Sequence, residues 1–151
     1  MGMFSGINIA ASSMSAQRLR MDVISNNIAN VETTRTPEGG AFKRSRIIMR
    51  PLVDQPYWRS PLLPEALDSG PGQGVRVARI EKDNTRGALR WDPTHPDAMV
   101  SGPEAGYVEQ SNVVLVNEMV DLIAASRSYE ASATLVESEK AAFSKALDIA
   151  R

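Results

Sequence analysis

Residues 112–148 read NVVLVNEMVDLIAASRSYEASATLVESEKAAFSKALD and contain neither proline nor glycine. One row of mostly apolar side chains recurs every seven residues through this stretch: Leu115, Leu122, Tyr129, Val136 and Phe143. The spacing predicts a single long helix from about Asn112 to Asp148, which would be roughly 55 Å long. Asn112 is the expected N-cap, because its side chain could accept a hydrogen bond from an orphan backbone amide.

A second apolar row runs beside the first. Met119, Ala133 and Leu147 occupy it, and Ser126 and Lys140 interrupt it. Near the start of the helix three further apolar residues widen the face: Val116, Val120 and Ile123. An apolar face wider than two seam positions indicates that this helix has more than one neighbour.

The N-terminal stretch carries a similar but thinner repeat. Its main row consists of Ile7, Met14, Met21 and Ile28, and its companion row of Ala10, Ile24 and Val31. This pattern predicts a helix whose seam would span roughly 37 Å. Alanine and methionine provide little core, so this helix needs a partner to become ordered. Small residues in both terminal stretches would let the two helices approach closely.

Residues 25–30, SNNIAN, are poor helix formers. One interpretation is the fraying end of a helix, with Asn30 in a left-handed C-cap conformation. The alternative is a set of side-chain amides that fix register or partner choice across an interface.

All nine prolines, and every glycine except Gly2 and Gly6, lie in residues 37–106. Short β-prone runs at residues 75–80 and 88–91 predict a hairpin between about Val75 and Trp91. The basic residues in 42–50 are expected on a solvated strand face, and residues 51–74 are expected to form a loop. The predicted fold is therefore mainly α, with paired, coiled-coil-like terminal helices (residues 1–36 and 107–151) and a small irregular β insertion (residues 37–106).

Composition excludes several classes of function. The formal net charge is −1, so the whole chain has no positive electrostatic field that would attract nucleic acid. Cysteine is absent, which excludes disulfides and thiolate metal sites. No run reaches the length of a membrane span, and the N-terminus lacks the basic start of a secretory signal. His95 lies between prolines in a predicted turn, with no second histidine to complete a metal site. No motif assembles into an active site, so we expect no catalytic residue, metal or cofactor.

Several short motifs resemble the flagellar axial proteins, the family of rod, hook and hook-associated subunits. The most specific is MDVISNNIANVETT at residues 21–34, followed by AFKR at residues 41–44. Later motifs resemble the small subunits of the proximal rod: HPDA at 95–98, GYVE at 106–109, NEMVDLI at 117–123 and ASRSYEA at 125–131. Residues 51–74 match no part of the family pattern.

This resemblance implies a structural subunit of the proximal rod, the drive shaft that carries torque from motor to hook. It implies paired helices that tile a helical tube, export without a cleaved signal peptide, and a place in the rod in the periplasmic space. The implied partners are copies of itself, other rod subunits, the junction protein that joins the rod to the membrane ring, and the export machinery. The implied interface residues are Met14, Met21, Ile24, Asn26, Asn27, Ile28, Asn30, Leu115, Met119, Leu122, Ser126 and Tyr129.

Two other classes remain open at this point. A soluble coiled-coil adaptor or export chaperone would be stably helical as an isolated chain. An enzyme would use His95 and the neighbouring aspartates as acid–base groups.

Overall fold

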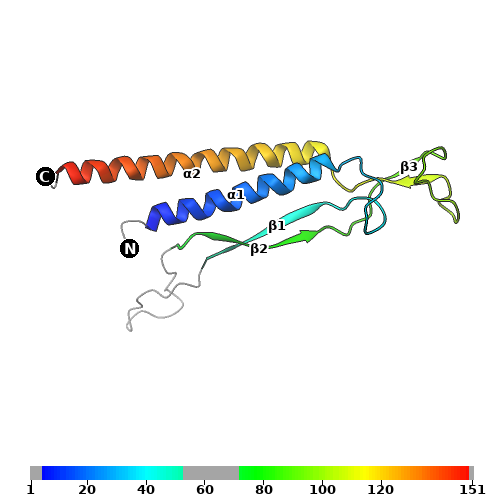
Figure 1. Cartoon of the computed structure of the whole chain (residues 1–151), viewed down its shortest axis with the longest axis horizontal. Coiled ribbons are helices and arrows are strands. Elements are labelled where there is room, and N and C mark those ends of the chain that lie inside the picture. The colour runs from blue at the N-terminus through cyan, green and yellow to red at the C-terminus, as the bar shows by residue number, and fades with distance from the viewer. Residues whose placement is uncertain (1–4, 53–71, 150–151) are drawn as a thin grey trace, which may run out of the picture.

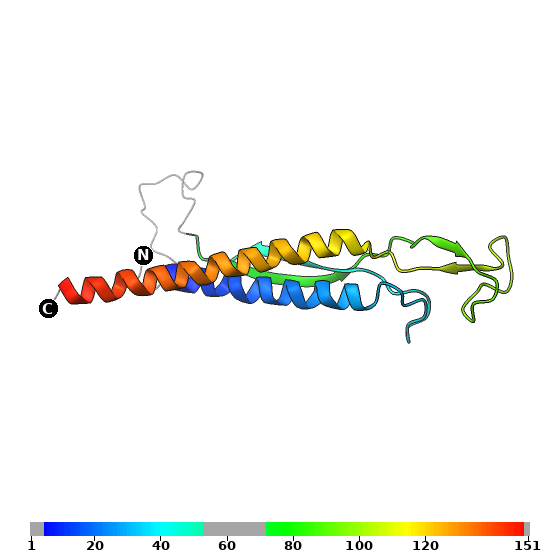
Figure 2. The same cartoon turned by 90° about the horizontal axis from the view of Figure 1, so that it is seen from above.

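The structure is a computed structural model that describes residues 5–52 and 72–149. It contains two long helices, α1 (Ser5–Ala29) and α2 (Leu115–Ile149), which lie side by side and run antiparallel (Figures 1 and 2). Short strands occupy the insertion between them. The prediction of paired terminal helices with a small β insertion is confirmed. No described helix is both long enough and apolar enough to cross a membrane.

The helices approach through small residues. Ala10 and Ala16 of α1 and Ala125 of α2 are all buried, and Ser132 donates a hydrogen bond to Ser13 across the helix pair at 3.1 Å. Side chains of this size let two backbones come close, but they bury little apolar surface each. The helix pair therefore has a thin core, as the alanine- and serine-rich seams predicted.

The strands pair differently from the sequence prediction. β1 (Ser45–Pro51) pairs antiparallel with β2 (Val75–Lys82), and β3 (Leu89–Trp91) pairs antiparallel with β4 (Tyr107–Glu109). The predicted hairpin between Val75 and Trp91 is therefore wrong. The seven residues of β1 offer β2 a partner of matching length, whereas β3 has only three residues. The predicted loop at residues 51–74 lies mostly outside the described residues.

The two strand pairs occupy different places. We name the β1–β2 pair the ribbon; it packs along α1, so that α1 lies between α2 and the ribbon (Figure 1). The β3–β4 pair projects beyond the end of the helix pair (Figures 1 and 2). There Trp91 and Tyr107 meet edge to face, with ring centroids 4.9 Å apart.

The predicted N-cap at Asn112 is wrong, and so is the interpretation of Asn30 as a left-handed C-cap, one of the two alternatives for residues 25–30. α2 begins at Leu115, and Val114 supplies the carbonyl that accepts the first helical hydrogen bond, from Glu118 N. At the end of α1, no described residue other than glycine has a positive φ, so Asn30 is not left-handed. Its side chain instead donates to the Asn26 carbonyl at 2.9 Å, which satisfies an acceptor of the last turn.

Candidate assembly interface

A network of polar side chains, which we name the polar junction, joins the two helices to the start of the ribbon. It consists of Arg20, Asn27, Arg44, Glu118 and Asp121. Asn27 of α1 and Glu118 of α2 face each other, and each is only 1% exposed. Asn27 Nδ2 donates to Glu118 Oε2 at 3.0 Å, and Arg44 Nε donates to Glu118 Oε1 at 2.6 Å. Both carboxylate oxygens are therefore satisfied, which a buried charge requires.

A second carboxylate extends this network to the surface. Asp121, one turn after Glu118, accepts from Arg44 Nη2 and from Arg20 Nη2, each at 3.2 Å. Arg44 thus holds two acids of α2, and Asp121 ties Arg20 of α1 to the same helix. The arrangement fixes the register of the two helices through charge as well as packing.

Asn27 also fixes the ribbon. Its Nδ2 donates to the Ser45 carbonyl at 2.7 Å, and its Oδ1 accepts from the Ser45 amide at 2.9 Å. The side-chain amide therefore imitates a neighbouring strand and satisfies both backbone groups of the first residue of β1. One asparagine connects α1, α2 and β1.

Asn112 has a different role from the predicted helix cap. Its Oδ1 accepts from the Arg44 amide at 2.7 Å, and its Nδ2 donates to the carbonyls of Asp83 and Thr85 at 2.9 and 3.0 Å. The side chain therefore links the chain before β1 to the chain after β2. The bonded carbonyls of Asp83 and Thr85 lie where the chain leaves β2 on its way to β3.

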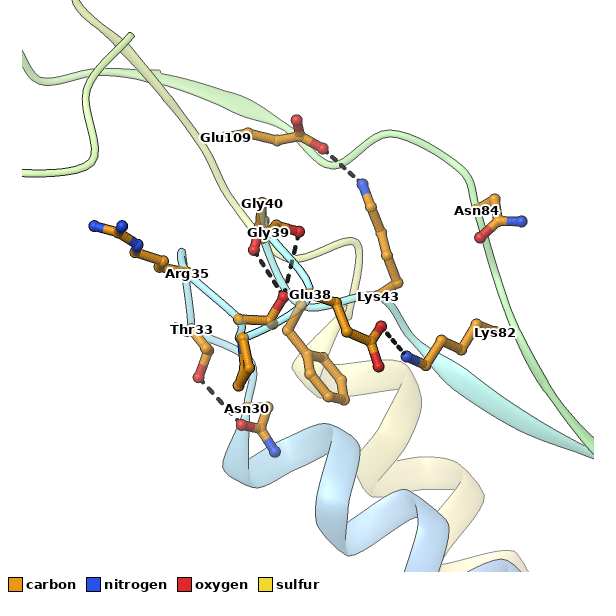
Figure 3. A pocket seen from close by; sticks show the side chains of 14 residues that line it. Asn30, Thr33, Arg35, Glu38, Gly39, Gly40, Lys43, Lys82, Asn84 and Glu109 are labelled. Carbon is orange, nitrogen blue, oxygen red and sulfur yellow. Dashed lines mark hydrogen bonds and ion pairs between the residues drawn. The ribbon is translucent and has the colours of Figure 1, made fainter.

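A half-open cavity of about 500 Å³ lies beyond the end of α1, under the loop of residues 33–43 (Figure 3). Lys43 reaches Glu109 and Lys82 reaches Glu38 at its rim, each at 2.6 Å. The hydrogen bond from Lys43 lowers the pKa of Glu109, and the hydrogen bond from Lys82 lowers the pKa of Glu38. Both acids stay ionised and paired at neutral pH, so these groups brace the loop.

His95 forms part of a turn, as predicted. Its amide donates to the Asp92 carbonyl at 3.3 Å, and its Nδ1 accepts from the Asp97 amide at 3.1 Å. In the described residues no three His, Cys, Asp or Glu side chains come together in a way that could hold a metal ion.

A row of exposed apolar side chains runs along one face of α2, and we name it the apolar stripe. It consists of Val116, Met119, Val120 and Ile123, whose exposed fractions are 68%, 48%, 62% and 55%. The spacing of three and four residues places all of them on one face. Glu118 and Ala125, which face α1, are almost fully buried, so the stripe points away from the partner helix. A contiguous exposed apolar face of this kind is typical of a protein interface.

The structure divides the predicted interface residues into three groups. Ile24 and Asn27 are buried inside the chain, where Asn27 is saturated with hydrogen bonds. The exposed group is Asn26, Leu115 and Met119. The remaining residues are half-buried: Met14, Met21, Ile28, Asn30, Leu122, Ser126 and Tyr129. The exposed group and the stripe are the residues best placed to meet another subunit.

Sequence reasoning missed the polar junction except for Asn27. The available signal was Glu118, a charged residue four positions before Leu122 on the face that turns toward α1. Val116, Val120 and Ile123 widen the apolar face in the sequence pattern, but they are not among the predicted interface residues.

Comparison with known proteins places both helices in one group. Residues 7–35 match the family described as "Flagella basal body rod protein", and residues 104–149 match "Flagellar basal body rod FlgEFG protein C-terminal". The flagellar basal-body rod protein FlgC of Borreliella burgdorferi is 58% identical over 149 residues, which is 99% of this chain and 98% of the relative. FlgC of Bacillus subtilis is 38% identical over 98% of each chain. FlgC of Salmonella typhimurium is 28% identical over 99% of this chain and 98% of the relative.

Proposed function

We propose a mode of rod assembly for this chain, which belongs to the family of flagellar basal-body rod proteins FlgC. The chain is a structural subunit of the proximal rod. It is a structural protein and not an enzyme. In our proposal the apolar stripe of α2 packs against helices of neighbouring rod subunits. The observation that carries the proposal is the exposure of Val116, Val120 and Ile123 on the face of α2 that turns away from α1.

The energetics support an intermolecular role for the stripe. Full burial of one Val, Ile or Met side chain contributes about 1.5–3 kcal/mol. The stripe residues are about half exposed, so roughly half of that amount is still available from each when a neighbour covers it. Several such contacts along a rod add to a stable assembly, although each subunit has only a thin core of its own.

The mechanical role follows from how the subunit is braced. Torque has to pass between subunits without being lost in bending within one subunit. The polar junction connects α1, α2 and the start of the ribbon. Asn112 connects the chain just before β1 to the chain just after β2. A heterologous contact between such rigid units continues as an open helical filament.

The proposed partners are copies of this chain, other rod subunits and the junction protein that joins the rod to the membrane ring. The proposed location is the part of the basal-body rod in the periplasmic space, reached through the flagellar export machinery. Asn26, Leu115 and Met119 belong to the proposed contact surface. The half-buried seam residues Met14, Met21, Ile28, Asn30, Leu122, Ser126 and Tyr129 would complete its edges.

The test is to replace Val120 with Asp in cells that contain only the variant chain. A buried unpaired carboxylate is costly, so we expect basal bodies without complete rods and loss of swimming. Ser138→Asp, at another exposed position on the same helix, is the matched control and should assemble normally. Circular dichroism of both purified chains checks that the helices are unchanged. Normal rods in the Val120→Asp strain would overturn the proposal.

A further inference from the structure

The ribbon is strongly basic, although the whole chain has a net charge of −1. β1 and β2 together contain five basic residues and one acidic residue, which gives the two strands a net charge of +4. Helix α2 has the opposite balance, with six acidic residues and three basic residues. Charge is therefore separated between two elements that pack on different sides of α1.

The arginines of the ribbon gather on its outward face. Met49 is paired with Val77 on the half-buried face that packs toward α1, whereas Arg46 and Arg50 are exposed. The register shift between Ile48 and Met49 leaves Ala78 of β2 without a partner in β1. A bulge of this kind moves the alternation of β2 by one residue. As a result Arg76 and Arg79, although three residues apart, share the outward face with Arg46 and Arg50.

The described outward face carries one carboxylate beside its four arginines. That carboxylate belongs to Glu81, which lies opposite Arg46 in the register and pairs with Arg79 at 3.4 Å. Arg46 and Arg50 are exposed and form no ion pair with any described residue, so their guanidinium groups can still bind a carboxylate. A partner that brings carboxylates to this face would form charge-assisted hydrogen bonds with them.

A matching row of carboxylates lies on α2. Glu130 and Glu137 are exposed, seven residues apart on one face, and neither forms an ion pair with another described residue. Seven residues of helix span about 10.5 Å. Arg46 and Arg50 are four residues apart along a strand, which is about 13 Å. The two spacings agree within the reach of an arginine side chain.

We propose that the outward face of the ribbon, through Arg46 and Arg50, binds the Glu130–Glu137 row on α2 of a second copy of this chain. Within one chain α1 separates the two surfaces, so each copy offers its ribbon to one neighbour and its α2 row to another (Figure 1). Such a contact continues from copy to copy instead of closing into a dimer. The inference rests on the proposed role in a rod, and it adds a salt-sensitive contact to that of the apolar stripe.

Charge reversal tests this contact in cells that contain only the variant chain. Arg46→Glu with Arg50→Glu should reduce the number of complete rods at least about tenfold, because like charges then face each other. Glu130→Arg with Glu137→Arg should do the same. All four substitutions together should restore rods. Lys140→Glu with Lys145→Glu, which reverses two exposed charges on the same helix, is the control and should leave rod number unchanged.

The outcomes separate this inference from the proposed function. Unchanged rods in both double variants, or a quadruple variant as defective as the doubles, would overturn the ribbon contact. If Val120→Asp still prevents rod assembly in that case, the role of the apolar stripe stands. If neither the charge reversals nor Val120→Asp affects rods, both proposals fail.

A covalent version of the test uses the absence of cysteine from this chain. Arg50→Cys and Glu137→Cys together should give a ladder of disulfide-linked multimers when purified basal bodies are oxidised. Arg50→Cys with Ser138→Cys, which turns the second thiol to another face of α2, should give far less. Equal ladders from the two pairs would contradict the proposed register.

Discussion

Arg44 and Glu118, 74 positions apart in the chain, are joined by a hydrogen bond of 2.6 Å between Arg44 Nε and Glu118 Oε1. Arg44 immediately precedes the ribbon, and Glu118 is in the first turn of α2. The Glu118 side chain is 1% exposed, whereas that of Arg44 is 30% exposed. The pair therefore fixes the insertion to the C-terminal helix through a carboxylate that is shielded from water and a guanidinium group that is partly exposed.

Replacement of Glu118 by Leu should destabilise the folded chain by about 3 kcal/mol, because removal of one partner of a buried ion pair costs 3–5 kcal/mol and Arg44 keeps some access to water. Glu137→Leu, at an exposed position of the same helix, should change stability by less than about 0.5 kcal/mol. Urea unfolding followed by circular dichroism measures both. Equal midpoints for the two variants would show that the junction does not hold the fold together.

Asn27→Asp should be more destabilising at neutral pH than Asn27→Ala. The aspartate would place a second carboxylate about 3.0 Å from Glu118 Oε2, and it would lose the donors that now bind Glu118 and the Ser45 carbonyl. A carboxyl pair of this kind favours one bound proton in the folded state, so the stability of Asn27→Asp should rise as the pH falls from 7 to 5. Thermal unfolding across that range measures it. A variant that loses stability over the same range would contradict the geometry.

The sequence was informative about the helices and less so about how the insertion is paired. A seven-residue repeat is a local signal, so Leu115, Leu122 and Tyr129 were enough to locate α2. Strand pairing is not local: β2 was recognised, but its alternation does not say whether the partner lies before or after it in sequence. Besides the matching length of β1, the hydrogen bonds from Asn112 to the carbonyls of Asp83 and Thr85 favour the observed pairing, and no local pattern indicates such a contact.

The polar junction escaped prediction for a related reason. A charged residue in an otherwise apolar helical face is usually an interruption that reaches solvent. Glu118 becomes a buried structural group only because Arg44 and Asn27 arrive from elements distant in sequence. The apolar stripe was visible as a widened face, but the sequence could not show which side of α2 would be covered by α1.

The Lys43–Glu109 pair predicts a loss of stability in acid. Hydrogen bonding from Lys43 lowers the pKa of Glu109 below the ordinary value of 4.5. A carboxyl group with a lowered folded-state pKa stabilises the protein above its unfolded-state pKa, and that contribution is lost as the pH falls through the folded-state value. The unfolding temperature should therefore decrease as the pH is lowered below about 4.5. Lys43→Met should reduce this dependence, and an identical pH profile in that variant would contradict the assignment.

Gly87→Ala should disrupt the β3–β4 pair and leave the helices intact. A Cβ at Gly87 would overlap the carbonyl of Gln110, a backbone atom that cannot move aside without breaking the hydrogen bond from Gln110 N to Ala88 O at 2.8 Å. We expect a cost of about 1–3 kcal/mol, borne by the strands because the helices do not depend on this contact. Gly72→Ala is the control, since a Cβ there meets nothing within 4 Å. Amide hydrogen exchange at Leu89–Trp91 should accelerate only in the Gly87 variant. Acceleration in α1 and α2 as well would mean that this strand pair helps to hold the helix pair together.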